Sequence, residues 1–335
     1  MSFDLDFSLL KRLVTAFGVA GDVDEVRELI TSEIKKYSNY TVDNYGVLLA
    51  GEINNPKIVV SAHIDEVGFQ VVKKIDSEGY SIAPVGSVSS CSFAGMPVVV
   101  KTSKGEKTSA VVYSGANIRQ ALSPDNFDNL ILYPLDKNID LATGNFGTFE
   151  KYYSESAEYL TATAVDNRVS VFAMLKLLES GLNLEKNKIM FAFITDEEME
   201  DHSADSISVR FKPEYALILD YCPIVKQQSS SELWSDKLAN DLPQVLYRGG
   251  RYLLHFELRQ FFDQLENEVK FSKSVLSEQT ITKLEPSNFE GNGFTKAVNI
   301  CLPALGYHNY VYTVKKTAVA NYLNFIQVVL EKLIG

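Results

Sequence analysis

Acidic residues and histidines follow short apolar runs in this sequence, where they could bind a metal ion. The run Ile58–Val60 leads into His63 and Asp65. The run KIMFAFIT leads into Asp196-Glu197-Glu198, and the run YALIL ends directly before Asp220. Such runs are typical of buried strands in a parallel sheet. Because ligands in open α/β sheets bind beyond the carboxyl ends of strands, the pattern predicts a functional site there.

Two further candidates lie beside predicted helices. Asp166 directly precedes a buried helix in TATAVDNRVS, and His308 follows an apolar segment in LPALGYHNY. Together with the strand ends they form a set of imidazoles and carboxylates without sulfur, which suits zinc, manganese or cobalt. Cys91, Cys222 and Cys301 are widely spaced and form no CxxC pair. The sequence therefore predicts neither a thiolate zinc site nor a disulfide framework.

The candidate set has the composition that two-metal hydrolysis requires. Two divalent ions about 3.5–4 Å apart need a bridging carboxylate and terminal ligands on each side. The water between them then loses a proton near neutral pH, and an uncoordinated carboxylate can shuttle that proton. The adjacent Glu197 and Glu198 suit such a division, with one bound to metal and the other free. Asp65 could hold the His63 imidazole from behind.

Each candidate also has a simpler interpretation. Asp166 could only cap the helix that follows it. The acidic run from 196 to 201 could be a solvated turn, and Asp220 could belong to a turn before a proline loop. Five separate positions agree on a metal site, so we favour ligation. His202, beside the acidic run, is expected to be a surface residue, and His255, in a helical pattern, to be structural.

Composition limits the class of protein. The 335 residues are enough for one large α/β domain with an insertion, or for two domains. A net charge of −11 argues against nucleic acid as a partner, which would need clustered Lys and Arg. No apolar run is long enough to span a bilayer, and the N-terminus lacks the basic start of a signal peptide. Together with the sparse cysteines, this predicts a cytoplasmic protein.

Apolar periodicity predicts the elements that position these residues. Two helices are expected within 8–37, two short strands within 40–53, a buried helix over Asn167–Ser180 and a closing helix over Lys315–Leu333. From about residue 68 to 160, short β-rich pieces alternate with turns. We therefore predict an α/β fold with a doubly wound, mostly parallel sheet and helices on both faces, interrupted by a small β-barrel or sandwich.

These segments resemble those of one enzyme family in the same order along the chain. SAHIDEVGF, AVDNRVS, ITDEEME, ALILDYC and GYHN are similar to the metal-site segments of the co-catalytic metalloaminopeptidases of the glutamyl/leucyl aminopeptidase type. That family includes the tetrahedral aminopeptidases and relatives labelled endoglucanases. The similarity extends to GVAGDVDEVRELI near the N-terminus and to PVGSVSSCSFAGMPVVVKTSKGE in the predicted insertion.

The resemblance implies a role for each metal-site residue. His63 and Asp220 would be the terminal ligands of one ion, and Glu198 and His308 those of the other. Asp166 would bridge the two ions. The ions would be zinc, or alternatively cobalt or manganese, with two bound per subunit.

The resemblance also implies an activity and an assembly. Glu197 would be the general base, Asp65 would orient His63, and peptides with a free N-terminus would be the substrates. The catalytic domain would comprise residues 1–67 and 161–335, and residues 68–160 would form a dimerisation domain. The assembly would be a homo-oligomer, from a dimer up to a dodecamer.

The chain departs from the family pattern near Thr161, Glu200 and Glu290. These changes motivate an alternative from another class, a metal-binding assembly protein that has lost catalysis. A further alternative is a glycoside hydrolase with two catalytic carboxylates, which needs no metal. Chelator sensitivity separates that alternative from the metallopeptidase.

Overall fold

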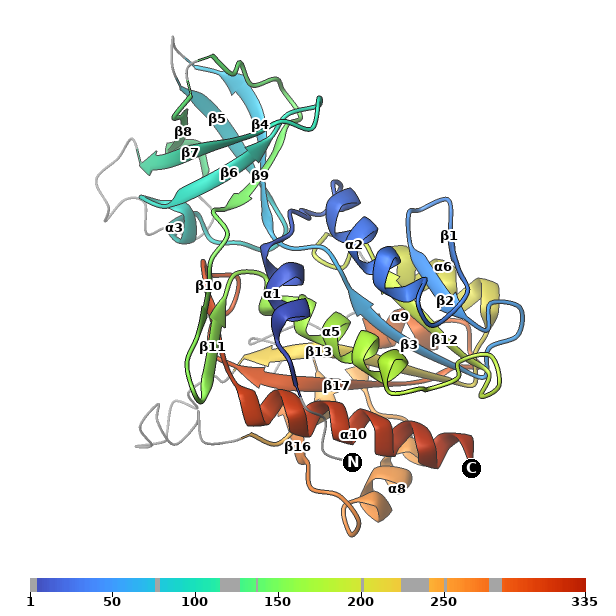
Figure 1. Ribbon diagram of the computed structural model, residues 1–335. Helices are drawn as coiled ribbons and strands as arrows, with labels where there is room; N and C mark the ends of the chain where they lie inside the picture. The colour runs from blue at the N-terminus through green and yellow to red at the C-terminus, as the bar shows by residue number, and fades with distance from the viewer. Residues whose placement is uncertain are drawn as a thin grey trace.

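The protein has a larger part built on one sheet and a smaller part that is a closed barrel (Figure 1). The computed structural model describes residues 5–75, 79–114, 127–136, 138–199, 202–223, 241–249, 252–276 and 285–335. Two chain segments join the parts, one after the strand that ends at His63 and one after the strand that ends at Phe149.

Four parallel strands form the centre of the larger sheet. In spatial order they are β12 (Ile189–Ile194), β3 (Ile58–His63), β13 (Tyr215–Pro223) and β17 (Lys296–Ala304). Every residue of β3 and β12 is buried, as their continuous apolar sequences predict. Since the strands run in one direction, their carboxyl ends meet at the same edge of the sheet.

Antiparallel pairs extend this sheet on both sides. On one side, β2 (Leu48–Gly51) pairs antiparallel with β12 and with β1 (Tyr40–Val42). On the other, β14 (Gln244–Gly249) pairs antiparallel with β17, and β15 (Tyr252–Leu253) and β16 (Ser272–Leu276) complete that margin. The sheet is therefore mixed, with a parallel core.

Helices cover both faces of the sheet, because side chains along a buried strand point alternately to its two faces. Ile58 and Val60 share a core with four helices, α1 (Ser8–Thr15), α2 (Asp24–Ile34), α5 (Val165–Glu179) and α10 (Lys316–Ile334). Val59 packs on the opposite face with α6 (His202–Phe211) and α9 (Glu285–Glu290). The helix α8 (Phe256–Leu265) adds Phe262 beside Phe325 of α10.

The smaller part is a closed six-stranded barrel. Its strands are β4 (Gly68–Lys74), β5 (Tyr80–Val85), β6 (Pro97–Lys101), β7 (Lys107–Ser114), β8 (Leu130–Pro134) and β9 (Phe146–Phe149), arranged in the order β4-β5-β8-β7-β6-β9. Rings from β4, from β9 and from the short helix α3 (Ser90–Phe93) meet inside, with Phe93 stacked on Phe149 at 4.3 Å between centroids. A 3-10 turn, Phe127–Asn129, precedes β8 and places the ring of Phe127 6.1 Å from that of Phe93.

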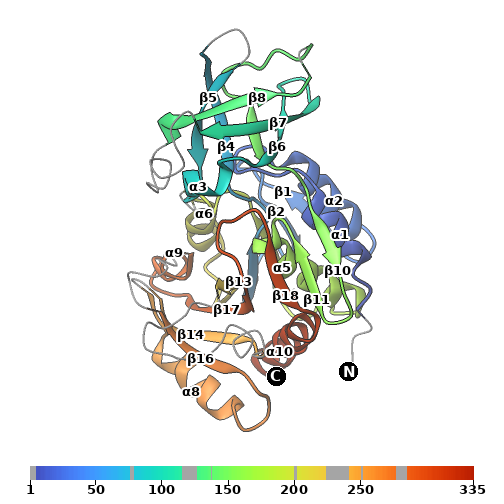
Figure 2. The same ribbon diagram turned by 90° about the vertical axis from the view of Figure 1, so that its left-hand side faces the viewer.

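A separate three-stranded sheet lies between the barrel and α10 (Figure 2). It pairs β10 (Tyr153–Glu155) with β11 (Tyr159–Ala162), and β11 with β18 (Tyr312–Lys315). Residues 153–160 of the expected insertion thus pair with the larger part, and the barrel strands end at Phe149. Among the described residues, no helix is long and apolar enough to cross a membrane.

Candidate metal centre

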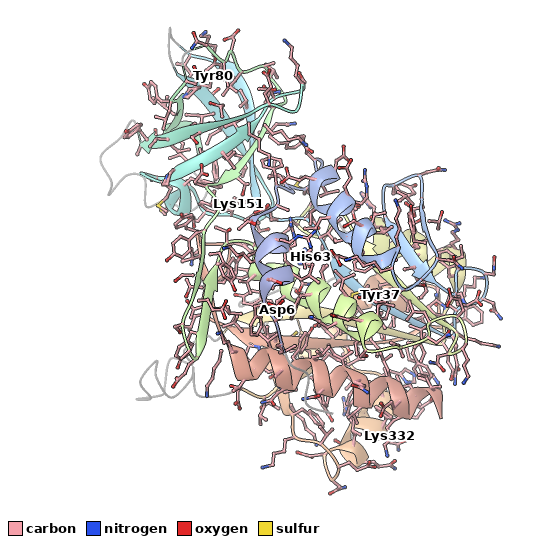
Figure 3. All side chains as sticks on the ribbon, in the orientation of Figure 1. Asp6, Tyr37, His63, Tyr80, Lys151 and Lys332 are labelled. Carbon is pink, nitrogen blue, oxygen red and sulfur yellow. The ribbon has the colours of Figure 1, made fainter. Side chains whose placement is uncertain are left out.

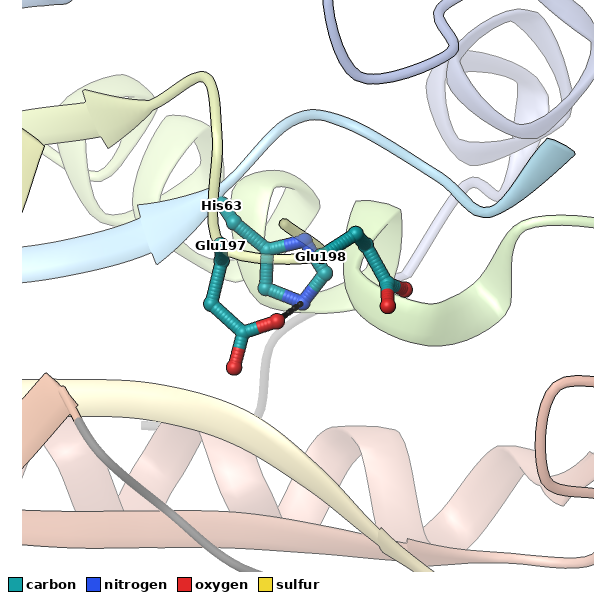
Figure 4. Close-up of side chains that lie close together, drawn as sticks. All are labelled: His63, Glu197 and Glu198. Carbon is teal, nitrogen blue, oxygen red and sulfur yellow. Dashed lines mark ion pairs between the residues drawn. The ribbon is translucent and has the colours of Figure 1, made fainter. Parts of the chain in front are cut away.

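His63 is the last residue of β3 and the centre of one group of ligands. Its imidazole is 1% exposed, because the strand and α5 enclose it. The Nε2 atom lies 3.1 Å from Oδ1 of Asp166, 3.7 Å from Oε2 of Glu197 and 3.8 Å from Oδ1 of Asp220. Figure 4 shows this ring beside the side chains of Glu197 and Glu198. Burial lowers the pKa of His63, but the surrounding carboxylates outweigh burial and raise that pKa well above its ordinary value.

His308 is the centre of a second group. It lies in the loop between β17 and β18. Its backbone has a positive φ of 47°, as does that of Gly306 two residues earlier, at 104°. Its Nε2 atom lies 3.2 Å from Oε2 of Glu198 and 3.8 Å from Oδ2 of Asp166. The two histidines therefore reach the same carboxylate from two distant segments of the chain.

Asp166 belongs to both groups and lies at the start of α5, where the backbone is irregular. Ala164 is left-handed, Asp166 has φ −73° and ψ 106°, and the peptide bond between Asp166 and Asn167 is cis. The Asn167 side chain donates to the carbonyl of Leu219 at 2.8 Å, next to Asp220. This contact ties the first turn of α5 to the middle of β13, and both aspartates lie near His63.

Backbone carbonyls orient both imidazoles. The Nδ1 atom of His63 lies 3.1 Å from the carbonyl oxygen of Asp65, and that of His308 lies 2.6 Å from the carbonyl oxygen of Ser87. Each contact favours a proton on Nδ1 and leaves the Nε2 lone pair for a metal ion, the arrangement usual for histidine ligands. Ser87 follows β5 of the barrel and was not a candidate from sequence, because its contact uses a backbone atom.

Asp65 links the two groups at a second point. Its Oδ2 atom accepts a hydrogen bond from the backbone N–H of Glu198 at 3.0 Å, and its Oδ1 atom lies 3.4 Å from Nδ1 of His63. The carboxylate is fully buried. Asp65 thus contacts both a histidine of the site and the backbone of the acidic turn after β12.

The structure brings six of the sequence candidates together as overlapping sets of possible ligands, whereas Asp65 lies behind His63 and Asp196 accepts the N–H of Ser203. In each set one ligand atom per residue lies within 4.8 Å of the others, and the sets are His63–Glu197–Glu198, His63–Asp166–Asp220 and Asp166–Glu198–His308. Burial, with the nearby charges of Asp166 and Glu197, raises the pKa of Glu198 well above its ordinary value. Crowded buried carboxylates and imidazoles fit divalent cations, which would compensate this charge.

His202, His255 and Glu290 lie apart from these sets. His255 caps α8, its Nδ1 atom accepting the N–H of Glu257 at 3.3 Å, as its structural interpretation predicted. His202 begins α6 with an exposed side chain. Glu290 ends α9 and accepts the N–H of Ala297 at 3.3 Å. Glu200 lies outside the residues that the structure describes.

A family model for the M42 glutamyl aminopeptidase matches residues 44–325, which span both parts of the fold and every candidate ligand. The chain belongs to the M42 family. This confirms the resemblance that the sequence segments indicate.

Curated proteins and solved structures are also similar to this chain. The lysyl aminopeptidase of Pyrococcus furiosus is 22% identical over 98% of both chains, and FrvX of Escherichia coli is 28% identical over 64% of each. The chain thus spans just under two thirds of the length of FrvX. An aminopeptidase from Desulfurococcus kamchatkensis has a similar fold, with a TM-score of 0.84, 20% identity and coverage of 97% of this chain and 94% of that one.

Proposed function

We propose that this M42 chain is an aminopeptidase that uses two divalent metal ions to remove N-terminal residues from peptides. The observation that carries the proposal is the position of Asp166, whose Oδ1 faces His63 and whose Oδ2 faces His308. A carboxylate shared by two ligand groups is the feature that a pair of adjacent metal ions requires. Asp220 completes the first group, and Glu198 the second.

The chain's own residues would divide the chemistry between them. The ions, when bound, would supply Lewis acidity that lowers the pKa of a water and polarises the scissile carbonyl. His63, Asp220, Glu198 and His308 would hold the ions at the two ends, and Asp166 would hold them together. Asp65 would keep the His63 ring in place through its backbone and side-chain oxygens.

Glu197 is the residue we assign as general base. Its side chain is 18% exposed, whereas that of Glu198 is 4% exposed, so Glu197 is the one that solvent and substrate reach. Glu197 would accept the proton of the attacking water and return it to the nitrogen of the leaving peptide. Adjacent glutamates of unequal exposure support one ligand and one proton carrier.

Substrate and assembly extend the proposal. We expect peptides with a free N-terminus as substrates, and a homo-oligomer, between a dimer and a dodecamer, in which residues 68–160 form the dimerisation domain. The TET1 peptidase of Pyrococcus horikoshii can assemble into a tetrahedron or a large octahedral shell. Its fold is similar to that of this chain, with a TM-score of 0.82 and 20% identity over 97% of this chain and 98% of that one. Zinc, cobalt or manganese as the metal, and a cytoplasmic location without nucleic-acid or membrane partners, remain predictions.

A metal-binding homologue without catalysis is the alternative that the altered segments motivate. Thr161 of β11 pairs with Thr313 of β18, Glu290 contacts the start of β17, and neither residue belongs to a set of possible ligands. These two departures therefore leave the ligand groups intact. Intact ligand groups are expected of both alternatives, so turnover, and not metal binding, separates them.

The test is release of N-terminal residues from a mixed peptide pool by the purified chain. The protein is assayed as prepared, after chelation, and after addition of zinc, cobalt or manganese, with N-acetylated peptides as the control. Metal-dependent release from free but not acetylated N-termini supports the proposal. Bound metal without release from any peptide would establish the non-catalytic alternative, and chelator-resistant hydrolysis of a glycoside would establish the glycosidase.

A further inference from the structure

The loop that carries His308 rests on the barrel part of the chain. Besides the 2.6 Å contact between His308 and the carbonyl oxygen of Ser87, Ser92 Oγ donates to Oδ1 of the neighbouring Asn309 at 3.2 Å. Ser92 lies in α3, which packs into the barrel. The position of this loop therefore depends on where the barrel sits.

The next residue of the loop contacts the segment by which the chain leaves the barrel. The ring of Tyr310 lies 5.7 Å from that of Phe149, at the end of β9, and 6.2 Å from that of Tyr152. Lys151 stands between these two aromatic residues in the sequence, and Figure 3 places it at the junction of the two parts. The segment that contacts the His308 loop is thus the one that contains Lys151.

Lys151 forms an ion pair with Glu66, on the segment by which the chain enters the barrel. The two side chains are 12% and 5% exposed, so water screens their attraction little. The Glu66 carboxylate also accepts the N–H of Gly18 at 3.2 Å and the hydroxyl of Thr148 at 3.4 Å. The entering and leaving segments of the barrel are therefore fastened to each other at Glu66.

The same carboxylate reaches the helix that carries the shared aspartate. Nη2 of Arg168, a fully buried residue two positions after Asp166, lies 3.5 Å from Oε1 of Glu66. The Arg168 guanidinium also donates to the carbonyls of Leu13 and Gly18, at 3.0 and 3.2 Å. One buried network thus joins the start of α5 to the barrel junction.

We propose that Lys151 and Glu66 are positioning residues for the metal centre. They hold the barrel in the position from which its contacts fix the His308 imidazole. They thereby set the affinity of the ion that His308, Glu198 and Asp166 would bind. The inference rests on the proposed two-metal function. Ser87 orients the His308 imidazole. The ion pair between Lys151 and Glu66 would hold Ser87, and the segment from Phe149 to Tyr152 that contacts Tyr310, in a fixed position relative to α5. Loss of the pair would weaken the second half of the centre while the half at His63 is kept.

Lys151→Met is the variant that tests the inference. It removes one cation and leaves the buried Glu66–Arg168 pair balanced, whereas a change at Glu66 would leave two buried cations unpaired. Lys151→Arg restores the charge and is the rescue variant. If Lys151→Met does not give folded protein, Lys151→Gln replaces it in the same measurements.

Lys101→Met is the matched control. Lys101 of β6 pairs with Asp22, between α1 and α2, at 2.5 Å, and the two side chains are 16% and 19% exposed. This pair also joins the barrel to the larger part at comparable burial, but through another strand. It therefore reports the effect of losing any ion pair between the two parts.

The measurement is zinc binding by chelator-stripped, full-length protein, followed by calorimetry and by counting bound ions after dialysis. We expect two tight ions in the parent and in Lys101→Met. In Lys151→Met we expect one tight ion and one weakened by about tenfold or more, the effect typical of losing support for a ligand. Lys151→Arg should recover part of the loss.

A double-variant comparison identifies the half of the centre involved. If Lys151 acts through His308, Lys151→Met should have no further effect on the ion that remains in a His308→Ala background. Parent-like binding of both ions by Lys151→Met, or equal losses in Lys151→Met and Lys101→Met, would overturn the inference. Fewer than two ions bound by the parent would overturn the two-metal proposal itself, and the inference with it.

Discussion

His63 and His308 present their Nε2 atoms to different oxygens of one carboxylate. The distances are 3.1 Å from His63 to Oδ1 of Asp166 and 3.8 Å from His308 to Oδ2. Each ring is held from behind by a backbone carbonyl, so neither can turn away without losing that hydrogen bond. The two ligand groups are therefore arranged about one shared residue, which makes that residue the most informative one to change.

We expect Asp166→Asn to lose both metal ions and His308→Ala to lose one. An amide keeps the shape of the carboxylate but offers one neutral oxygen in place of two charged ones, so it cannot bridge two cations. The measurement is the number of ions retained after dialysis against metal-free buffer. Retention of two ions by Asp166→Asn would show that Asp166 does not bridge.

Glu197→Gln should lose turnover by about 10²–10⁴-fold, the usual contribution of a general base. Because Glu197 is more exposed than the other glutamate of the turn, we expect the variant to keep its metal content. The measurement combines peptide release with metal analysis of the same preparation. Glu28→Gln, on the exposed side of α2, is the control and should behave like the parent.

A near-normal rate in Glu197→Gln would show that another group carries the proton. Loss of both turnover and metal would instead make Glu197 a ligand. The geometry allows Glu197 either role, since its Oε2 atom lies 3.7 Å from Nε2 of His63. Metal analysis of the same preparation separates the two outcomes.

The sequence predicts a site here because its candidate ligands follow elements with strong local signals. His63 ends β3, and Glu197 and Glu198 follow β12, so parallel pairing brings them to one edge of the sheet. The apolar run YALIL predicts a strand that ends before Asp220, but β13 continues to Pro223, and Asp220 lies within it, beside His63. Asp166 was found because it precedes a helix whose apolar periodicity is clear. The tight first turn of α5, with its non-helical Asp166, has no such signal in the sequence.

Contacts made by backbone atoms or across long sequence separations were not predictable. Ser87 acts through its carbonyl, which any residue could supply. Lys151 lies in a polar, aromatic stretch that is typical of a surface, and its ion pair with the buried Glu66 joins residues 85 apart in the sequence. The pairing of β11 with β18 joins residues about 150 apart, and short mixed strands carry too little periodicity to indicate such a partner.

Metal ions should stabilise the folded chain. The ligands come from β3, α5, β13, the turn after β12 and the loop before β18, so the site exists only when these elements are assembled. Each ion at about 100 times its dissociation constant would add about 2.7 kcal/mol to the free energy of unfolding. Thermal unfolding of stripped protein with increasing zinc measures this, and Asp166→Asn, stripped in the same way, should respond much less. An equal rise of the unfolding temperature with zinc in the parent and in Asp166→Asn would show that the stabilising ions bind elsewhere.

The contact between α1 and α2 should make stability depend on pH. Glu33 of α2, 7% exposed, accepts a hydrogen bond from Arg12 of α1 at 2.9 Å and pairs with Lys36. Burial raises the pKa of Glu33, but these two cations outweigh burial and lower it below its usual 4.5. The unfolded chain then takes up the proton first as the pH falls, so the contribution is complete above the unfolded pKa and is lost below the folded one.

Glu33→Gln should therefore lower the free energy of unfolding by about 1 kcal/mol near pH 7, since Arg12 and Lys36 are themselves half exposed. The difference from the parent should shrink toward zero as the pH falls below the lowered pKa of Glu33 in the folded chain, because Glu33 is then protonated in both states. Urea unfolding of chelator-stripped protein at several pH values measures this, with Glu28→Gln as the control that should show little difference at any pH. A deficit that stays constant down to the lowest pH would mean that packing at Glu33, and not its charge, stabilises the junction of the two helices.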